Sequence, residues 1–135
     1  MSRENVETFK RFVDAFNRRD VEAIVEVVDA EVEWRPAAPV ALGGKATVYR
    51  GHTGISQGLR DLHDSFAELQ IEVSEFQEAG DRILGTGRIR TRGKGSGAEF
   101  DSAFGAVIEF ENGKATQIRS YLDLGEALEA AGLRE

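Results

Sequence analysis

The chain has 135 residues, no cysteine, two histidines and a formal net charge of −7. This length fits a single domain over 1–135, and the residue content disfavours a disulfide framework, a thiol nucleophile or a His/Cys metal site, so we expect no metal or other cofactor and a reducing, cytoplasmic environment. No segment approaches the roughly 20 apolar residues of a membrane span, the N-terminus lacks the apolar core of a signal peptide, and "RIRTRGK" is too short a basic cluster for a polyphosphate partner, so we expect neither membrane nor nucleic-acid binding.

The first half of the chain predicts helices. Apolar residues at three- and four-residue spacing place one stripe on a helix over about 5–18: Val6, Phe9, Phe12, Val13 and Phe16. Asp20 is a predicted N-cap for a second, shorter helix, and Thr53 for a third whose apolar face holds Ile55, Leu59, Leu62 and Phe66. Between the second and third helices, "AEVEWRP" alternates like a strand, and 36–45 has the composition of a loop or lid.

The second half predicts strands, because the apolar period changes from about 3.6 to 2. Turn signals at "EAGD", "GKGSG" and "ENGK" separate antiparallel strands near 69–78, 82–92, 98–110 and 115–122, and a short helix over 124–131 follows. Helices gathered on one side of an antiparallel sheet make an α+β fold.

With this order of elements, the chain resembles the nuclear transport factor 2-like (NTF2-like) superfamily, and more narrowly the SnoaL-like proteins related to ketosteroid isomerase. The resemblance is carried by "FVDAFNRRDVEAIVEVVDAEVEWRP", "YRGHTGI" and "VIEFENGKATQIRSYLDLGEAL". It implies a curved antiparallel sheet packed on three N-terminal helices, a cone or cystatin-like roll with a deep apolar pocket, and often a homodimer across the outer face of the sheet. Because the superfamily mixes isomerases, cyclases, hydrolases, dehydratases and non-catalytic domains, the fold alone does not select an activity.

The resemblance also identifies what this chain lacks. The oxyanion-hole tyrosine of ketosteroid isomerases falls on Phe12, their general-base aspartate on Trp34 and their protonated aspartic acid on Ala106. An enolate-forming isomerase needs such a base and such donors, so the sequence argues against that activity at this site. The aspartate that limonene epoxide hydrolases place in the last strand falls on Ser120, which argues against their chemistry as well.

Two residues are candidate catalytic groups. Asp123 is the acid of an "R-x-Y-x-D" ending, but its D-x-x-E spacing to Glu126 also suits an N-cap of the last helix. His52 lies just before the third helix, and an imidazole with an unperturbed pKa of about 6.5 suits proton transfer, although a histidine there also serves as a local hydrogen-bonding residue.

Strand alternation leaves the direction of two arginines open. If Leu84 and Thr86 point inward, Arg88 and Arg90 follow them and would anchor an anion or a carbonyl at the pocket. If Gly85 and Gly87 mark a bulge, Ile89 points inward and the arginines form an outer stripe that pairs with Glu99, Asp101 and Glu109.

The candidate pocket residues are those that the strand faces or the family positions direct inward: Phe12, Trp34, Tyr49, Phe66, Arg88, Arg90, Phe104, Ala106, Ser120 and Leu122. We expect them to bind a small hydrophobic molecule. If the chain is an enzyme, we expect a cofactor-free isomerase, cyclase or hydrolase of a carbonyl-bearing or polycyclic molecule, with His52 or Asp123 transferring a proton. The alternative is a non-catalytic binding or protein-interaction module.

Overall fold

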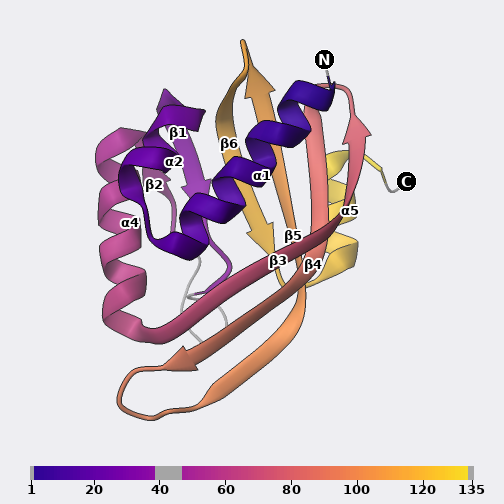
Figure 1. The fold of residues 1–135 in the computed structure, drawn as a ribbon. Helices are drawn as coiled ribbons and strands as arrows, with labels where there is room; N and C mark the ends of the chain where they lie inside the picture. Colours follow the sequence, from indigo (N-terminus) through magenta and orange to yellow (C-terminus); the bar gives the residue numbers. More distant parts are fainter. Residues whose placement is uncertain (1, 39–46, 134–135) are drawn as a thin grey trace.

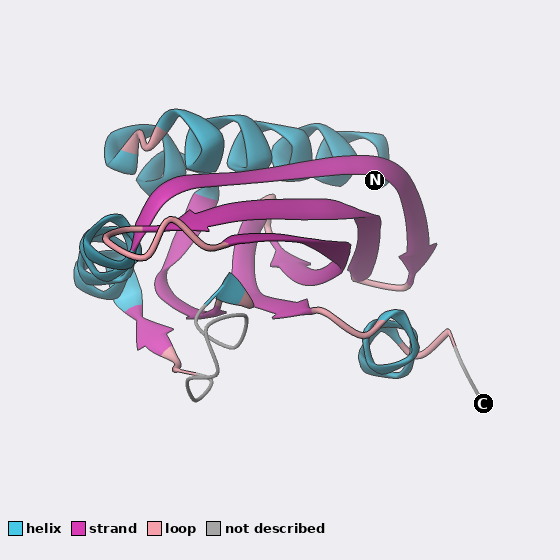
Figure 2. Cartoon of the chain, turned by 90° about the horizontal axis from the view of Figure 1, so that it is seen from below, coloured by secondary structure: helices cyan, strands magenta, loops and turns pink. Residues whose placement is uncertain are grey.

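A single six-stranded sheet organises the part of the chain that the structure, a computed structural model, describes, namely residues 2–38 and 47–133. The sheet is strongly curved, and three helices lie against one of its faces while the C-terminal helix lies against the other (Figures 1 and 2). The predicted loop over 36–45 falls outside the described residues from residue 39 onward.

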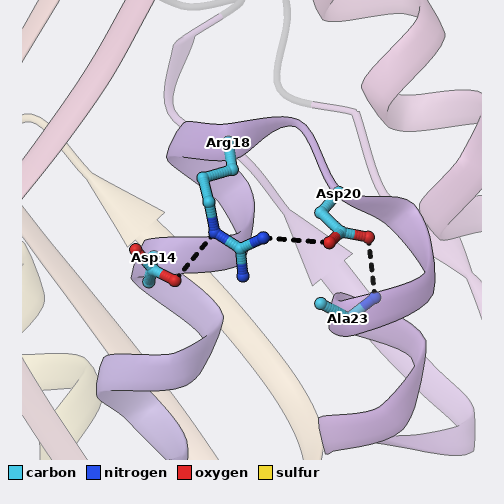
Figure 3. Close-up of polar contacts among 4 residues, drawn as sticks. All are labelled: Asp14, Arg18, Asp20 and Ala23. Carbon is cyan, nitrogen blue, oxygen red and sulfur yellow. Dashed lines mark hydrogen bonds and ion pairs between the residues drawn. The ribbon is translucent and has the colours of Figure 1, made fainter.

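The first two helices form where the sequence predicts them. Helix α1 spans Ser2–Arg18 and α2 spans Val21–Val27. Asp20 is the N-cap of α2, since its carboxylate accepts a hydrogen bond of 3.1 Å from the N–H of Ala23. Figure 3 shows that Arg18 joins both helices, with Nε 2.9 Å from Asp14 and Nη1 3.0 Å from Asp20. The turn between the helices is therefore fixed by short-range polar contacts.

The third helix differs from the prediction at both of its ends. Helix α4 spans Gly51–Ser65, so it begins before Thr53, and its N-cap Arg50 makes no capping bond from its side chain. Phe66 has strand dihedrals, although its N–H still bonds the carbonyl of Leu62. Its ring therefore continues the apolar face of the helix while its backbone begins the next strand. Of the helices in the described ranges, none is long and apolar enough to cross a membrane.

The strands confirm the predicted α+β class and add one detail. They are β1 (Val28–Arg35), β2 (Tyr49–Arg50), β3 (Phe66–Ala79), β4 (Arg82–Gly93), β5 (Glu99–Glu111) and β6 (Lys114–Tyr121), in the order β2-β1-β6-β5-β4-β3. All neighbours are antiparallel except β1 and β6, which run parallel. The sheet is therefore mixed, because β1 pairs in parallel with β6, the last of the four consecutive antiparallel strands.

Each face of the sheet has its own apolar cluster. The main core lies between the sheet and helices α1, α2 and α4, and it includes Phe9, Trp34 and Ile108. A smaller cluster lies on the outer face, where α5 (Leu124–Ala131) covers Leu84 and Val107 with Ala127 and Ala131. The outer face is thus partly apolar even though most of its side chains are polar.

This second cluster decides between the two directions that the sequence leaves open for β4, and it corrects the reason given for the second one. Ile83 and Ile89 belong to the main core, whereas Leu84 lies under α5 on the opposite face. Pairing between β4 and β5 is continuous, so no bulge in β4 changes the face. The bulge lies instead in β3 at Ser74, between the pairs Val73–Gly87 and Glu75–Thr86. A Cβ on Gly87 would lie 1.8 Å from the carbonyl oxygen of Glu72, so the close approach of the two strands there requires glycine.

Candidate functional site

A small apolar cavity lies between α1 and the concave face of the sheet. Its walls come from α1, β1, the segment after β1 and the central strands: Phe12, Phe16, Trp34, Pro36, Ala37, Ala38, Ile71, Ile89, Phe104 and Ser120. The cavity volume is about 20 Å³, close to what one water molecule occupies. In this structure the side chains fill most of the space enclosed by the sheet.

Aromatic rings make up one wall of this cavity. Trp34 is 2% exposed, and its ring lies edge-on to Phe16 at a centroid distance of 6.1 Å. Trp34 also contacts Tyr49, with the ring centroids 5.7 Å apart and the rings tilted by 41°. Such contacts stabilise a rigid wall, since edge-on aromatic pairs contribute about 0.5–1.5 kcal/mol each beyond the area they bury.

Tyr49 directs its hydroxyl group away from this wall. The hydroxyl donates a hydrogen bond of 2.7 Å to Oδ2 of Asp61 on α4. Burial, followed by this bond and the charge of Asp61, raises the pKa of Tyr49 to about 12. Tyr49 thus supports the cavity through Trp34 and does not contribute a polar group to it.

The cavity contains little that could transfer a proton. Among the described residues that line it, Ser120 carries the sole hydroxyl group, and none carries a carboxylate or an imidazole. Phe12 and Trp34, which occupy two positions where ketosteroid isomerases have catalytic groups, contribute only rings and an indole N–H. Ala106, the third such position, is buried in the main core and does not line the cavity.

A surface pocket of about 270 Å³ adjoins the cavity at the end of β6. The two share Pro36, Ala37 and Ser120, so these three residues form the wall between them. The other lining residues of the surface pocket are Arg35, Tyr121, Leu122, Asp123 and Glu126. The sequence identified Ser120, Leu122 and Asp123 as candidates and predicted a loop or lid from residue 36, but it did not identify Arg35, Tyr121 or Glu126.

Asp123 lies in this surface pocket and also caps α5. One carboxylate oxygen accepts a hydrogen bond of 3.1 Å from the N–H of Glu126, which confirms the predicted capping contact. The side chain is exposed. Asp123 is therefore held at the rim of the pocket by the start of the helix.

Other candidate residues lie away from the cavity. Nε2 of His52 is 3.4 Å from the carbonyl oxygen of Val28, and His52 lines neither the apolar cavity nor the adjoining surface pocket. Phe66 is 1% exposed and belongs to the main core without reaching the cavity. Phe12, Trp34, Phe104 and Ser120 are the candidates that the fold brings together around it.

Arg88 and Arg90 are on the outer face of the sheet, so the second of the two predicted orientations is the one observed. Both are exposed, and both pair with Asp101: Nη2 of Arg88 is 2.8 Å and Nε of Arg90 is 3.7 Å from its carboxylate. They border a surface groove of about 400 Å³ that runs over the free edge of β3 to α1. Neither guanidinium lies in the apolar cavity.

No metal site is evident in residues 2–38 and 47–133, where no group of three His, Cys, Asp or Glu side chains is placed to hold an ion. The site is an apolar cavity with one hydroxyl group, next to a surface pocket that the carboxylates of Asp123 and Glu126 help to line.

Comparison with known proteins identifies the same fold. An NTF2-like protein from Burkholderia pseudomallei is 26% identical, with a TM-score of 0.77 over 95% of this chain and 97% of that one. TerC, crystallised with polyporic acid, is 25% identical, with a TM-score of 0.76 over 96% of this chain and 98% of that one. A putative SnoaL-like polyketide cyclase from Jannaschia is 17% identical, with a TM-score of 0.72 over 98% of this chain and 94% of that one. At this identity the similarity shows the fold alone.

No curated protein sequence matches the chain. The model of the SnoaL-like domain matches residues 9–118, from the first aromatic residues of α1 to the middle of β6. Because this match covers most of the sequence, the chain belongs to the SnoaL-like domain family.

Proposed function

We propose that the chain binds a small, mostly apolar molecule between α1 and the concave face of its sheet. The observation that carries the proposal is the cavity itself, which is lined by aromatic and aliphatic side chains with one hydroxyl group at Ser120. Apolar walls with few polar groups are typical of small-molecule sites, where burial provides affinity and the polar groups orient the ligand.

The ligand would occupy the cavity together with the adjoining surface pocket. Pockets for drug-sized ligands have volumes of about 300–1,000 Å³, whereas the cavity measures about 20 Å³ and the surface pocket about 270 Å³. Displacement of the shared wall, chiefly Pro36 and Ala37, would join the two spaces. Ser120 would then lie in the middle of the joined site and could donate a hydrogen bond to a ligand oxygen.

The proposed ligand class is a carbonyl-bearing or polycyclic molecule. Trp34 and Phe104 offer flat apolar surfaces for such a ring system, and Ser120 offers a donor for its oxygen. TerC, a relative of similar length, was crystallised with polyporic acid. That compound is therefore a rational first member of a ligand panel.

Catalysis is a second candidate function, and Asp123 is the residue that favours it. Its carboxylate lines the same surface pocket as Ser120, so a ligand in the joined site would lie within reach of a base. A cofactor-free isomerase, cyclase or hydrolase reaction would use Asp123 to remove a proton and Ser120 to polarise an oxygen. His52 lines neither space, so a role for it would require a ligand that extends well beyond them.

The contrasting candidate is a non-catalytic module, and the scarcity of acid–base groups in the cavity favours it. Chemistry requires a base within reach of bound substrate, while binding requires only shape and burial. The two functions make different predictions for Asp123, which is dispensable for binding but not for turnover.

Thermal denaturation with a panel of polyporic acid, steroids, aromatic polyketides and terpenes tests the binding proposal. A ligand should raise the Tm of the wild type. Ala37→Leu and Ser120→Val, which fill the cavity, should abolish the rise. Ser102→Val is the matched control, because Ser102 lies on the inward face of β5 but does not line the cavity. Equal rises in all four proteins would contradict binding at this cavity.

The homodimer that the family resemblance implies stays a prediction. We propose that two copies pair through the outer face of the sheet, where charged residues such as Arg88 and Asp101 are exposed. Sedimentation equilibrium would measure the state directly. A monomer at all concentrations would contradict the pairing.

A further inference from the structure

Two arginines lie opposite each other on adjacent strands at the outer face of the sheet. Arg35 on β1 and Arg119 on β6 are Cα partners in the parallel pair. Their sequence neighbours Trp34 and Ile118, also partners, are buried in the main core at 2% and 0% exposure. Since successive side chains of a strand point to opposite faces, both arginines point outward, away from the apolar cavity.

Neither arginine has a carboxylate partner in the described part of the chain. No hydrogen bond or ion pair joins Arg35 or Arg119 to any residue in those ranges, and Nε of Arg119 is buried without a partner. Two carboxylates of this face pair elsewhere: Glu33 lies 3.6 Å from Arg50, and Glu109 lies 3.7 Å from Arg82. Asp123 and Glu126 line a pocket together with Arg35 but form no ion pair with it. In a chain with 24 acidic and 17 basic residues, this arrangement is unexpected.

The arrangement is also unfavourable for the protein alone. Two like charges on adjacent strands repel each other, and a buried donor without an acceptor loses its bond to water with no compensation. Arg35 is held in place all the same, with its guanidinium 5.0 Å from the ring centroid of Tyr121. That contact fixes the side chain without neutralising its charge.

A small cavity of about 90 Å³ lies beside the pair. It is lined by Glu33, Arg35, Val48, Gln117, Ile118 and Arg119. Val48 is 42% exposed and provides an apolar side to the cavity. The volume suits the head group of a small anion and is well below that of a drug-sized ligand.

We propose that Arg35 and Arg119 bind a small carboxylate anion on the outer face of the sheet. Guanidinium groups match carboxylates in shape and charge, and a carboxylate between the two would reduce the repulsion between their charges and give Nε of Arg119 its missing acceptor. Val48 would contact the apolar part of such an acid. This site lies on the opposite face from the apolar cavity. It shares Arg35 with the surface pocket that adjoins the cavity, but Arg119 lines only the anion site. The response of Arg119→Met therefore separates this proposal from the function proposed for the cavity.

Glu33 is the one acidic residue among the lining side chains, and its charge opposes the anion. Its ion pair with Arg50 keeps it at the rim and reduces this repulsion. Glu33→Gln should therefore strengthen anion binding, which is the opposite of the effect expected for the two arginines.

Thermal denaturation in acetate against chloride, at constant ionic strength and neutral pH, tests the site with acetate as the probe. The Tm of the wild type should rise and saturate, by about 3–6 °C at acetate roughly tenfold above its Kd. Arg35→Met and Arg119→Met keep an apolar stem but remove the charge, and each should abolish the rise. Arg92→Met is the matched control, because Arg92 is a half-buried arginine of the same sheet that pairs with Glu68, and it should respond as the wild type does.

Two results would overturn the proposal. One is a wild-type Tm that acetate does not raise above chloride, or a rise that Arg35→Met and Arg119→Met retain. The other is a wild-type dimer that dissociates in sedimentation equilibrium both on Arg119→Met and on addition of acetate, since the carboxylate would then come from a second copy of the chain.

Discussion

The side-chain amide of Asn17, near the end of α1, bonds both backbone polar groups of Ile71 on β3. Nδ2 donates to the carbonyl oxygen of Ile71 at 2.8 Å, and the N–H of Ile71 donates to Oδ1 at 2.9 Å. Strand β3 is an edge strand of the sheet, and unpaired groups on such an edge can pair with another chain. Asn17 therefore pairs the exposed backbone groups of Ile71 on this edge, as a further strand would.

Replacement of Asn17 by alanine should destabilise the protein and open this edge. Both groups of Ile71 lose their partner, at a cost of about 1–2 kcal/mol in the free energy of unfolding. Urea denaturation would measure the loss, and size-exclusion chromatography would detect association through the freed strand. Asn17→Asp keeps the acceptor but loses the donor, so an intermediate loss is expected; equal stability of all three proteins would contradict the role of the amide.

Gly58 on α4 should not tolerate a side chain. A Cβ at this position would lie 2.5 Å from Cζ3 of Trp34 and 3.0 Å from Cδ2 of Tyr49. Alanine gains about 1 kcal/mol in helix propensity over glycine, but displacing a buried indole costs typically about 1–3 kcal/mol. We therefore expect Gly58→Ala to lower the free energy of unfolding measured in urea.

Thr53→Ala is the control for this change on the same helix. Thr53 is exposed and lies inside α4, and it does not cap that helix. Its replacement should alter stability by less than about 0.5 kcal/mol. An increase in stability for Gly58→Ala would show that the contact with Trp34 is looser than the structure indicates.

Two substitutions of Asp123 distinguish its structural role as an N-cap from a catalytic role. Asp123→Ala removes the cap of α5 and should cost about 1 kcal/mol in urea denaturation. Asp123→Ser restores an N-cap oxygen without a carboxylate, so it should recover most of the stability. If a substrate is found, turnover lost in both variants would support Asp123 as the base, and turnover retained in Asp123→Ser would contradict it.

Tyr49 should make stability fall at high pH. The folded protein holds the pKa of Tyr49 at about 12, against 10.0 for a free tyrosine. Because the unfolded chain ionises first, the stabilisation is complete below pH 10 and is lost as the pH rises toward 12. Titration by tyrosinate absorbance should show one late tyrosine that disappears in Tyr49→Phe, and an earlier midpoint in Asp61→Asn. A titration at the ordinary pKa would contradict the buried bond to Asp61.

His63 should make stability fall on the acidic side. Burial, followed by the charges of Arg19 and Lys94, lowers the pKa of His63 below its usual 6.5. The unfolded chain therefore takes up the proton at a higher pH than the folded chain, and stability declines as the pH falls below 6.5. His63→Gln should flatten this decline in urea denaturations over that range, and a decline that persists unchanged in His63→Gln would contradict the role of His63.

The sequence by itself determined the local features of this protein. The periods of apolar residues gave the helices and strands, because burial of one face imposes a repeat of about 3.6 or 2 residues. Asp20 and Asp123 were predictable as caps, since an N-cap bonds a backbone N–H only three residues ahead. The family resemblance identified Phe12, Trp34 and Ser120 as pocket residues, strand alternation identified Phe104, and all four line one cavity.

Only the tertiary structure decided which face of a strand is covered, and by what. An apolar Leu84 indicates burial but does not reveal that α5 covers it from the outer face, so the direction of Arg88 and Arg90 could not be read from alternation. Two further relationships join segments far apart in the chain: the hydrogen bonds between Asn17 and Ile71, and the position of Arg35 opposite Arg119 on adjacent strands. Such contacts follow from the curvature and strand order of the sheet, which no local pattern of residues encodes.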